Sequence, residues 1–565
     1  MGRAIALRVS LSLAKHPSLR GHARWARRVA HQIRYFEYAP DNYFATDAAP
    51  QQIAATRCTG LARLRRSLVP GGAQSLRYMQ SLETCVSDVS FTAAYRVPFP
   101  YRAGLPPELR HGSVLTQSAG MRVCDLDGIW RYDLSGSYGL NVFGYDFYKG
   151  CLAAGFAEAQ SLGPLLGAYH CAVQANVQAL RAISGLDEVS FHMSGTEAVM
   201  QAVRLARYHT RRSHLVRLCG AYHGWWDGVQ PGVGHTRAVD DVYTLADLCP
   251  QTLRVLEQRR DIACVLINPL QALHPNSEGP VDSALLASDR HAGFDRDRYT
   301  QWLAQLRAVC SRRGIVLIFD EVLTGFRLGL RGAQGYFGVT ADLVTYGKTL
   351  GGGLPLGVLC GRAELMRRFR DSAPADLCLA RGTFSAHPYV MACMRVFLER
   401  IRTPELQACY ATADSLWKAR VAQLNAQLAA GQLPVRIAHL QSVMTVLYQR
   451  PSRYNWMLQF YLRAEGLELS WIGTGRLILP INCPQGDFEE VTRRIVRAAR
   501  QMLADGWWWQ APHLTNRWIK RQLLRDLLRA RLRGARAGAE PVEAARAPVM
   551  ATQEVVGPCD RSALR

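Results

Sequence analysis

Short, largely apolar runs alternate with amphipathic helical stretches between about residues 150 and 390, and this alternation constrains the fold more than any other feature. The runs occupy residues 213–218, 262–267 and 315–319, and residues 198–208 have the spacing of an amphipathic helix. Runs of this kind are typical of buried parallel strands, and strands separated by helices indicate an α/β domain. We find no internal repeat.

The regions on either side of this domain have other patterns. An Asp127-Gly128 pair between two strand-like runs predicts a hairpin. Farther on, helical stretches at 389–401 and 412–428 alternate with strand-like runs at 442–448 and 476–481, which predicts a smaller α+β domain. We therefore predict five parts: a basic helical extension (1–90), an N-terminal segment of the small domain (91–150), a large α/β domain (151–390), the C-terminal small domain (391–510), and a basic helix with a disordered tail (511–565).

Positive charge is concentrated at the two ends of the chain. Residues 1–36 hold eight Arg or Lys and no acid, and residues 517–536 hold eight with one acid, Asp526, so the ends supply 15 of the 23 net charges. Such ends fit an acidic acyl carrier protein or an anionic membrane surface, although a solvated basic face is the plainer interpretation. We do not expect nucleic-acid binding, because the interleaved aromatics of known modules are missing.

Composition excludes several classes of protein. Hydrophobic residues make up 48%, which excludes a disordered chain, and no apolar run reaches the ~18 residues of a membrane span. Fifteen cysteines occur without a CxxC pair, so we expect reduced thiols, no metal site and a cytoplasmic location. Arg8 interrupts the first apolar run, which argues against a secretory signal, whereas an Arg-rich organelle presequence stays open.

Lysine is rare in this chain, and one lysine lies in a glycine-rich turn. Only five of 68 basic residues are lysines, and Lys348 sits between a strand-like run and three glycines. A nucleotide-binding phosphate loop would have its glycines before the lysine, so that interpretation is disfavoured. Because arginine stays protonated and cannot form a Schiff base, Lys348 is a candidate Schiff-base amine.

Two further candidates lie at the ends of expected elements. Asp320 ends the run at 315–319, where ligands of parallel sheets bind, although a capping or ion-paired acid would have the same pattern. Ser194, Gly195 and Thr196 open a helix and would offer hydroxyls and free N–H groups to an anion, although a plain helix cap is the alternative.

Tyr222 and His223 follow the run at 213–218, and an aromatic ring there could stack on a planar ligand or simply pack. An anion cradle, an aromatic platform, a carboxylate and an amine together match the needs of pyridoxal 5'-phosphate (PLP). Its phosphate binds a helix start, its ring is sandwiched, its pyridinium nitrogen pairs with a carboxylate and its aldehyde forms an imine with lysine.

Several motifs, in order, resemble the class III aminotransferases of PLP fold type I, which have an aspartate aminotransferase-like large domain. The resemblance covers about residues 95–505 and points to the branch that holds glutamate-1-semialdehyde 2,1-aminomutase and the aminotransferase domains of polyketide and peptide synthases. The motifs are SGTEA (194–198), YHG (222–224), FDEVLTGFR (319–327), GKTLGGG (347–353) and GTFSAHP (382–388).

The resemblance implies a role for each matching residue. Lys348 would carry the cofactor as a Schiff base and move the proton, and Asp320 would keep the pyridinium protonated. Tyr222 and Val322 would lie on the two ring faces, with His223 adjoining. The phosphate would be bound by Ser194, Gly195 and Thr196, and by Thr383 from the partner subunit, which implies a homodimer.

Substrate contacts follow from weaker matches. Arg102, in PYRA (100–103), resembles the arginine that binds the substrate carboxylate in the aminomutase. Tyr138, in GSY (136–138), resembles an aromatic of the substrate pocket, and Arg476 resembles the carboxylate-binding arginine of other class III enzymes.

Two positions depart from the aminomutase pattern. Asn268 stands where the family usually has Glu, which removes a charge near the cofactor, although Gln271 and Pro275 still resemble the synthase-type stretch. His387 replaces the aminomutase's Asn and also favours the synthase-type domains.

The sequence therefore predicts PLP-dependent transamination of a keto, aldehyde or acyl-carrier-bound carbonyl from a small amino donor, through a Lys348 Schiff base. One alternative is an aminomutase, which moves the amino group within one molecule. Another is a membrane- or partner-binding protein on an inactive scaffold, which the presence of both Lys348 and Asp320 disfavours.

Overall fold

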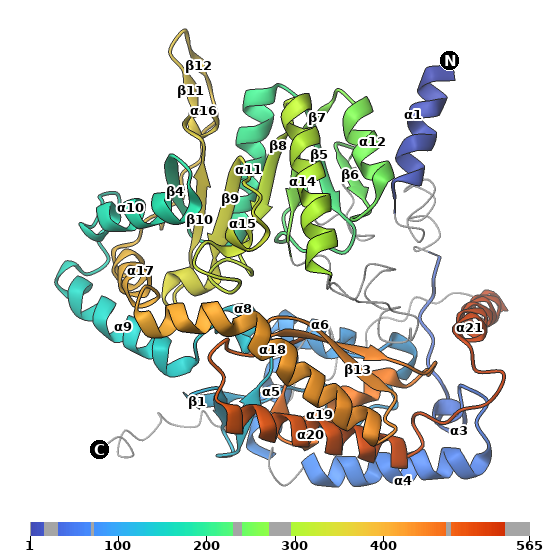
Figure 1. The fold of residues 1–565 in the computed structure, drawn as a ribbon. Helices are drawn as coiled ribbons and strands as arrows, with labels where there is room; N and C mark the ends of the chain where they lie inside the picture. The colour runs from blue at the N-terminus through green and yellow to red at the C-terminus, as the bar shows by residue number, and fades with distance from the viewer. Residues whose placement is uncertain are drawn as a thin grey trace.

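A computed structural model describes residues 2–15, 32–68, 73–229, 240–269, 295–469 and 476–536. Gln271, Pro275 and the tail beyond residue 536 lie outside this range. The centre of the molecule is a seven-stranded sheet with helices on both faces, which confirms the α/β prediction (Figure 1). In order across the sheet, its strands are β4 (Glu188–His192), β10 (Gly357–Gly361), β9 (Leu343–Gly347), β8 (Val316–Asp320), β7 (Ile262–Ile267), β5 (His214–Leu218) and β6 (Val242–Leu245).

Strand direction determines where the site can form. β8 runs parallel to β7 and β9, and β5 runs parallel to β6 and β7. β10 is antiparallel to both β9 and β4, so β4 points the same way as β9. The carboxyl ends of six strands therefore lie at one edge of the sheet, and β10 alone begins there.

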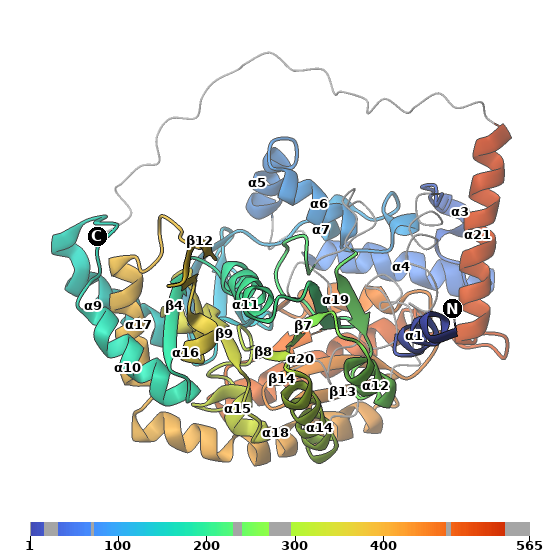
Figure 2. The same ribbon diagram turned by 90° about the horizontal axis from the view of Figure 1, so that it is seen from above.

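Helices cover both faces of this sheet (Figure 2). α11 lies on one face, and α12 and α14 lie on the other. The four strand positions between 316 and 319 are fully apolar and buried, as expected between two helical layers. The helices of this part are α9 (Tyr145–Ala159), α10 (Ala172–Ser184), α11 (Gly195–Thr210), α12 (Pro250–Gln258), α14 (Arg296–Arg313), α15 (Gly332–Phe337), α16 (Ala363–Met366) and α17 (Pro388–Arg400), with the hairpin β11 (Phe369–Arg370) and β12 (Ala373–Leu377).

A second body of structure lies beneath the carboxyl edge of the sheet (Figure 1). It contains the predicted hairpin, in which β2 (Arg122–Asp125) pairs antiparallel with β3 (Trp130–Asp133). The two sheets of this body have the orders β1-β2-β3-β15 and β13-β14-β16. The remaining elements are β1 (Leu115–Ala119), β15 (Leu467–Glu468), β13 (Val435–Leu440), β14 (Val443–Tyr448), β16 (Arg476–Ile478), α7 (Pro107–Arg110), α8 (Gly136–Gly139), α18 (Pro404–Ala430), α19 (Leu458–Ala464) and α20 (Gln485–Ala504).

The segments after residue 32 and after residue 505 pack onto this smaller body, whereas the first helix, α1 (Gly2–Leu13), packs against α12 of the large domain. Arg57 is fully buried, pairs with Asp47 at 2.7 Å and donates to the carbonyl of Gly506 at 2.9 Å. Trp507 and Trp508 are buried in the same core cluster as residues of the N-terminal helices. The end elements are α1 (Gly2–Leu13), α3 (Pro40–Tyr43), α4 (Gln51–Leu68), α5 (Ala73–Glu83), α6 (Ser87–Tyr95) and α21 (Asn516–Arg536).

Within the described residues, no helix is both long and apolar enough to cross a bilayer.

Candidate active site

Four of the expected residues meet at the carboxyl edge of the large sheet. Asp320 is the last residue of β8, and Lys348 follows β9 directly. Ser194 lies between β4 and α11, and Tyr222 lies in the loop after β5. Because these strands share one direction, their ends deliver an acid, an amine, a helix start and an aromatic ring to one place.

Asp320 is a buried carboxylate with a fixed orientation. His223 Nδ1 lies 2.7 Å from Asp320 Oδ2. The other oxygen accepts from the backbone N of Val322 at 3.1 Å and from Thr345 Oγ1 at 3.3 Å. His223 Nε2 is also buried and has no hydrogen-bond partner within the described residues. The carboxylate is therefore held in one direction, as a group that must face a ligand nitrogen needs to be.

Lys348 presents an amine that loses its proton easily. Its Nζ donates to the carbonyl of Tyr138 at 2.7 Å. Burial lowers the pKa of Lys348 to about 8, and the charges of Arg476 and Arg327 act in the same direction, while Asp320 opposes them. Near neutral pH the neutral, nucleophilic fraction is thus on the order of a hundredfold larger than for an ordinary lysine.

The turn between β4 and α11 forms a tight anion cradle. Ser194 caps α11 by accepting from the backbone N of Glu197 at 3.3 Å, and the Glu197 carboxylate reaches back to the backbone N of Met193 at 3.0 Å. A Cβ on Gly195 would lie 2.9 Å from Val322 Cγ1, and one on Gly357 would lie 1.9 Å from the Ser194 carbonyl oxygen. Only glycine fits at these two positions, which lets the turn close against the neighbouring strands.

The loop after β5 brings an aromatic ring to the same place. Gly224 has φ +87°, and a Cβ there would lie 2.5 Å from Thr196 Oγ1, so the loop packs on the start of α11. The side chain of Tyr222 is 62% exposed, and its pKa is raised by partial burial and by the negative charge of Asp320. The ring is therefore free to cover a planar ligand beside Asp320.

The fold and this site define a PLP-dependent enzyme of fold type I. The helix start would hold the phosphate, the buried carboxylate would face the pyridine nitrogen, and the low-pKa amine would hold the aldehyde carbon. The glycine cradle and the orphaned, buried His223 Nε2 fit a ligand beside them. The cofactor expected from the sequence therefore suits the residues that the structure assembles.

Comparison with known proteins identifies the family. Residues 107–473 match the model of the family Aminotransferase class-III, and the chain belongs to this family. It is 34% identical over 342 residues to a glutamate-1-semialdehyde 2,1-aminomutase of Nitratidesulfovibrio vulgaris (strain DP4), covering 59% of this chain and 76% of that protein. The resemblance drawn from the motifs is thus confirmed, and with it an enzyme that uses PLP.

Solved structures agree with this assignment. A transaminase with PLP bound is 26% identical, with a TM-score of 0.58 over 74% of this chain and 94% of that one. A glutamate-1-semialdehyde aminomutase from Pseudomonas aeruginosa PAO1 shares the fold at 19% identity, with a TM-score of 0.62 over 79% of this chain and 99% of that one.

Of the three expected substrate residues, Tyr138 and Arg476 lie near Lys348, and Arg102 contacts another part of the protein. Tyr138 meets Lys348 through its backbone carbonyl, and Arg476, at the start of β16, is close enough to influence the pKa of Lys348. Arg102 instead lies with its guanidinium carbon 4.5 Å from the centre of the Tyr95 ring. Within the described residues no hydrogen bond or ion pair connects Arg102 with Lys348, Asp320 or Tyr138, so the structure does not bring it into the group.

Thr383 is exposed in the single chain, in the loop that follows β12. A Cβ on the preceding Gly382 would lie 3.9 Å from Glu197 Oε2, so the loop passes the start of α11. The expected role of Thr383 at a partner's phosphate stays a prediction. Asn268 directly follows β7, at the same sheet edge as Asp320.

Sequence reasoning assigned no role to two buried arginines near this group. Arg327 donates to the carbonyls of Leu479 and Asn141 at 2.9 and 3.0 Å, and thereby ties the loop after β8 to the smaller body. Arg96 is buried beside Tyr138, and its Nε donates to Gln459 Oε1 at 3.2 Å. Arg327 already stands in the FDEVLTGFR motif, whereas nothing in the sequence distinguishes Arg96 from the other arginines.

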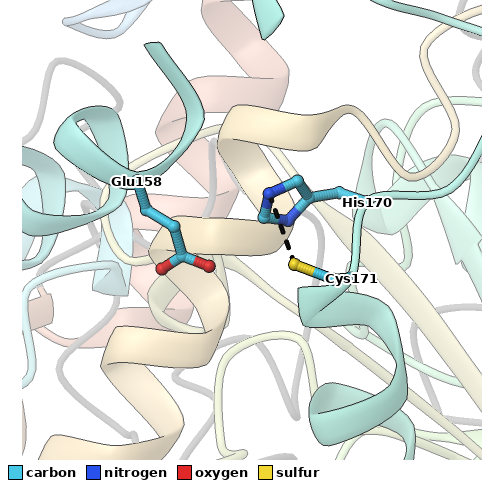
Figure 3. Close-up of side chains that lie close together, drawn as sticks. All are labelled: Glu158, His170 and Cys171. Carbon is cyan, nitrogen blue, oxygen red and sulfur yellow. Dashed lines mark hydrogen bonds between the residues drawn. The ribbon is translucent and has the colours of Figure 1, made fainter. Parts of the chain in front are cut away.

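A separate cluster of side chains that could bind a metal ion consists of Glu158, His170 and Cys171 (Figure 3). His170 Nδ1 accepts from the backbone N of Ala172 at 3.2 Å, so a neutral imidazole carries its proton on Nε2, the nitrogen that faces Cys171. Glu158 is already paired with Arg395. The three side chains are close enough to share a metal ion, but Arg395 competes for the Glu158 carboxylate.

The low pKa of Lys348 leads to a direct test. We expect the cofactor-free enzyme to react at Lys348 with an amine-directed reagent at a rate that rises through about pH 8, because only the neutral amine reacts. Arg476→Gln removes a cation that opposes protonation of Lys348, so the pH midpoint of Lys348 labelling moves upward. Arg476→Lys keeps the positive charge, so the pH midpoint stays unchanged. The measurement is a pH series of labelling read by mass spectrometry of the Lys348 peptide. Identical midpoints for wild type and Arg476→Gln would show that Arg476 lies outside the site.

Proposed function

We propose that this enzyme is a transaminase: it takes an amino group from a donor amine and gives it to a separate carbonyl compound. Family membership leaves both transamination and intramolecular amino transfer open. The observation that carries the proposal is the placement of two arginines. Arg476, the residue that resembles the carboxylate-binding arginine of other class III enzymes, lies near Lys348, whereas Arg102, the aminomutase-type arginine, rests on the Tyr95 ring.

PLP, when bound, supplies an electron-withdrawing ring that lets a Cα–H bond of the substrate break. Lys348 would hold the cofactor and then carry the proton between the substrate carbon and the cofactor, for which a pKa near 8 is suited. Asp320, oriented by His223, would keep the ring nitrogen protonated. Tyr222 and Val322 would cover the two ring faces, and Ser194, Gly195 and Thr196 would bind the phosphate.

We further propose that the enzyme works as a homodimer in the cytoplasm. In that dimer Thr383, which is exposed in one chain, would reach the phosphate of the partner's site. The acceptor would be a keto or aldehyde compound, free or attached to an acyl carrier protein.

The deciding experiment follows amino transfer with and without a separate donor. We expect turnover of a carbonyl acceptor only when a donor amine is present, with release of one keto acid for each amine formed. Turnover of glutamate-1-semialdehyde to 5-aminolevulinate without any donor, at a rate equal to or above the transaminase rate, would establish the aminomutase instead.

Arg96 suggests which donors the enzyme takes. Burial lowers the pKa of Arg96 to about 10, and the neighbouring Arg463 acts in the same direction, with Glu468 and Tyr138 opposing. A buried guanidinium beside Tyr138 would bind a second carboxylate, in addition to the one bound by Arg476. The favoured donor is therefore an amino dicarboxylic acid.

We expect Arg96→Gln to raise KM for such a donor by about 10- to 100-fold, which is the loss of one charge-assisted hydrogen bond, and to leave kcat nearly unchanged. A donor with one carboxylate should be used equally well by both proteins. Arg102→Gln is the matched control and should change neither constant. The opposite pattern, with KM raised in Arg102→Gln alone, would mean that the carboxylate binds as in the aminomutase.

A further inference from the structure

Two helices from opposite ends of the chain, α1 and α21, lie on the same side of the molecule (Figures 1 and 2), and both expose apolar side chains. In α21 these are Leu524, Leu528 and Leu532, which are 57%, 51% and 67% exposed and lie four residues apart. That spacing places them along one stripe of the helix. An exposed ladder of leucines has no role in the catalytic site described above.

The inner face of α21 fixes how the helix is turned. Ile519 is buried, and Leu523 packs against the core of the smaller body. Asp526 accepts from Tyr38 Oη at 2.9 Å and lies 3.2 Å from an Arg453 nitrogen. Since Asp526 is the only acid of the helix, the outward face carries no negative charge.

Cations flank the leucine stripe on this outward face. Arg517, Arg521, Arg525, Arg529 and Arg531 are all exposed, as is Lys520. Leucines and cations therefore share one face of a helix that is about 32 Å long. Arginine stems can lie along an apolar phase while their charged ends meet anions at its border.

The N-terminal helix repeats this arrangement. Ile5, Val9 and Leu13 of α1 are 55%, 51% and 46% exposed, again four residues apart. α1 is anchored to the large domain, because it packs against α12 and because the carbonyl of Ala14, the buried residue just after the helix, accepts from the backbone N of Ala246 at 2.8 Å. Figure 1 looks nearly along α21 but across α1, so the two helices run in different directions on one flank.

We propose that this flank, the end-helix surface, docks the enzyme on an anionic phospholipid bilayer. The surface consists of Leu524, Leu528 and Leu532 with their flanking cations on α21, and of Ile5, Val9 and Leu13 on α1. Cations complement lipid phosphates, and the leucines enter the boundary between headgroups and acyl chains. An acidic protein would be bound by the cations alone, whereas stripes on two differently directed helices fit an extended, flat, partly apolar partner.

The test uses the full-length holoenzyme and sedimentation with vesicles. We expect binding to vesicles that contain phosphatidylglycerol and none to pure phosphatidylcholine. The variant Leu524→Ser/Leu528→Ser/Leu532→Ser should bind at least about tenfold more weakly, while keeping its PLP absorbance and its turnover of soluble substrates. Arg521→Gln/Arg525→Gln/Arg529→Gln should lose binding to the same extent.

A matched control separates this surface from net charge. Arg493→Gln/Arg497→Gln/Arg500→Gln removes three exposed charges from α20 and should bind like wild type. The proposal is overturned if the leucine variant binds as tightly as wild type, because adsorption is then purely electrostatic. It is equally overturned if the wild-type enzyme does not bind the phosphatidylglycerol vesicles. The same holds if an acidic carrier protein, equimolar with the enzyme, releases all of the enzyme from the vesicles. None of these outcomes depends on which amino donor the enzyme uses.

Discussion

We expect Lys348→Ala to abolish turnover, with kcat reduced by on the order of 10⁴-fold or more, because Lys348 is the proposed covalent anchor of the cofactor and the proposed proton carrier. The variant also leaves no pyridoxyl group on residue 348 after reduction with borohydride. The measurements are steady-state rates, the absorbance spectrum of the purified protein, and mass spectrometry of the reduced peptide.

The chain offers sharp controls for this prediction, because lysine is so rare. Lys149→Ala and Lys418→Ala remove lysines outside the site and should keep both turnover and trapping. Lys348→Arg keeps a positive charge but cannot form the covalent bond, so it should fail like the alanine variant. A Lys348→Ala protein that is still labelled on another lysine and still turns over would remove Lys348 from its proposed role.

Asp320→Asn is the second large effect. The amide keeps the shape of the carboxylate but removes the negative charge that we propose to face the cofactor nitrogen, so we expect kcat to fall by roughly 10³-fold with little change in fold. The substitution also replaces the carboxylate oxygen that lies 2.7 Å from His223 Nδ1. Rapid-reaction spectra with a donor amine measure the rate at which the Cα–H bond of the donor breaks, and thermal unfolding monitors the fold.

Asp342→Asn is the appropriate comparison for Asp320→Asn. Asp342 is also buried and accepts from Arg307 at 2.8 Å and from the backbone N of Leu317 at 2.8 Å, but it lies at the opposite end of the strands. Its substitution should cost stability, about 1–3 kcal/mol, and leave kcat within a few fold. Equal losses of kcat in both variants would mean that Asp320 acts only through the fold.

The sequence predicted those parts of the site that depend on strand ends. Buried strands are recognised by their apolar composition, and whatever follows them must appear at one sheet edge, so the runs place Asp320 and Lys348 together. Ser194 was recognised instead from the helix that it opens. The hairpin at Asp127-Gly128 was predictable for another reason, because its turn chemistry is local.

Residues whose placement depends on packing between distant segments could not be predicted. Arg102 has the right spacing from the hairpin, yet the Tyr95 ring beside it takes up its guanidinium. Arg96, only six positions earlier, lies beside Tyr138, because Gln459 of the smaller body binds it. Among 63 arginines, spacing alone cannot distinguish the two, since the partner of Arg96 lies more than three hundred residues away.

The contacts of Arg57 with Asp47 and Gly506 join segments from both sides of the family domain into one folded unit. The family model spans residues 107–473, yet both members of this ion pair precede that span and the carbonyl follows it. An enzyme trimmed to residues 107–473 would expose part of its interior to water. Removing Asp47 alone would leave the buried Arg57 without its ion-pair partner, at a cost of about 3–5 kcal/mol in folding free energy. Segments outside the family model therefore form part of the folded interior of this protein.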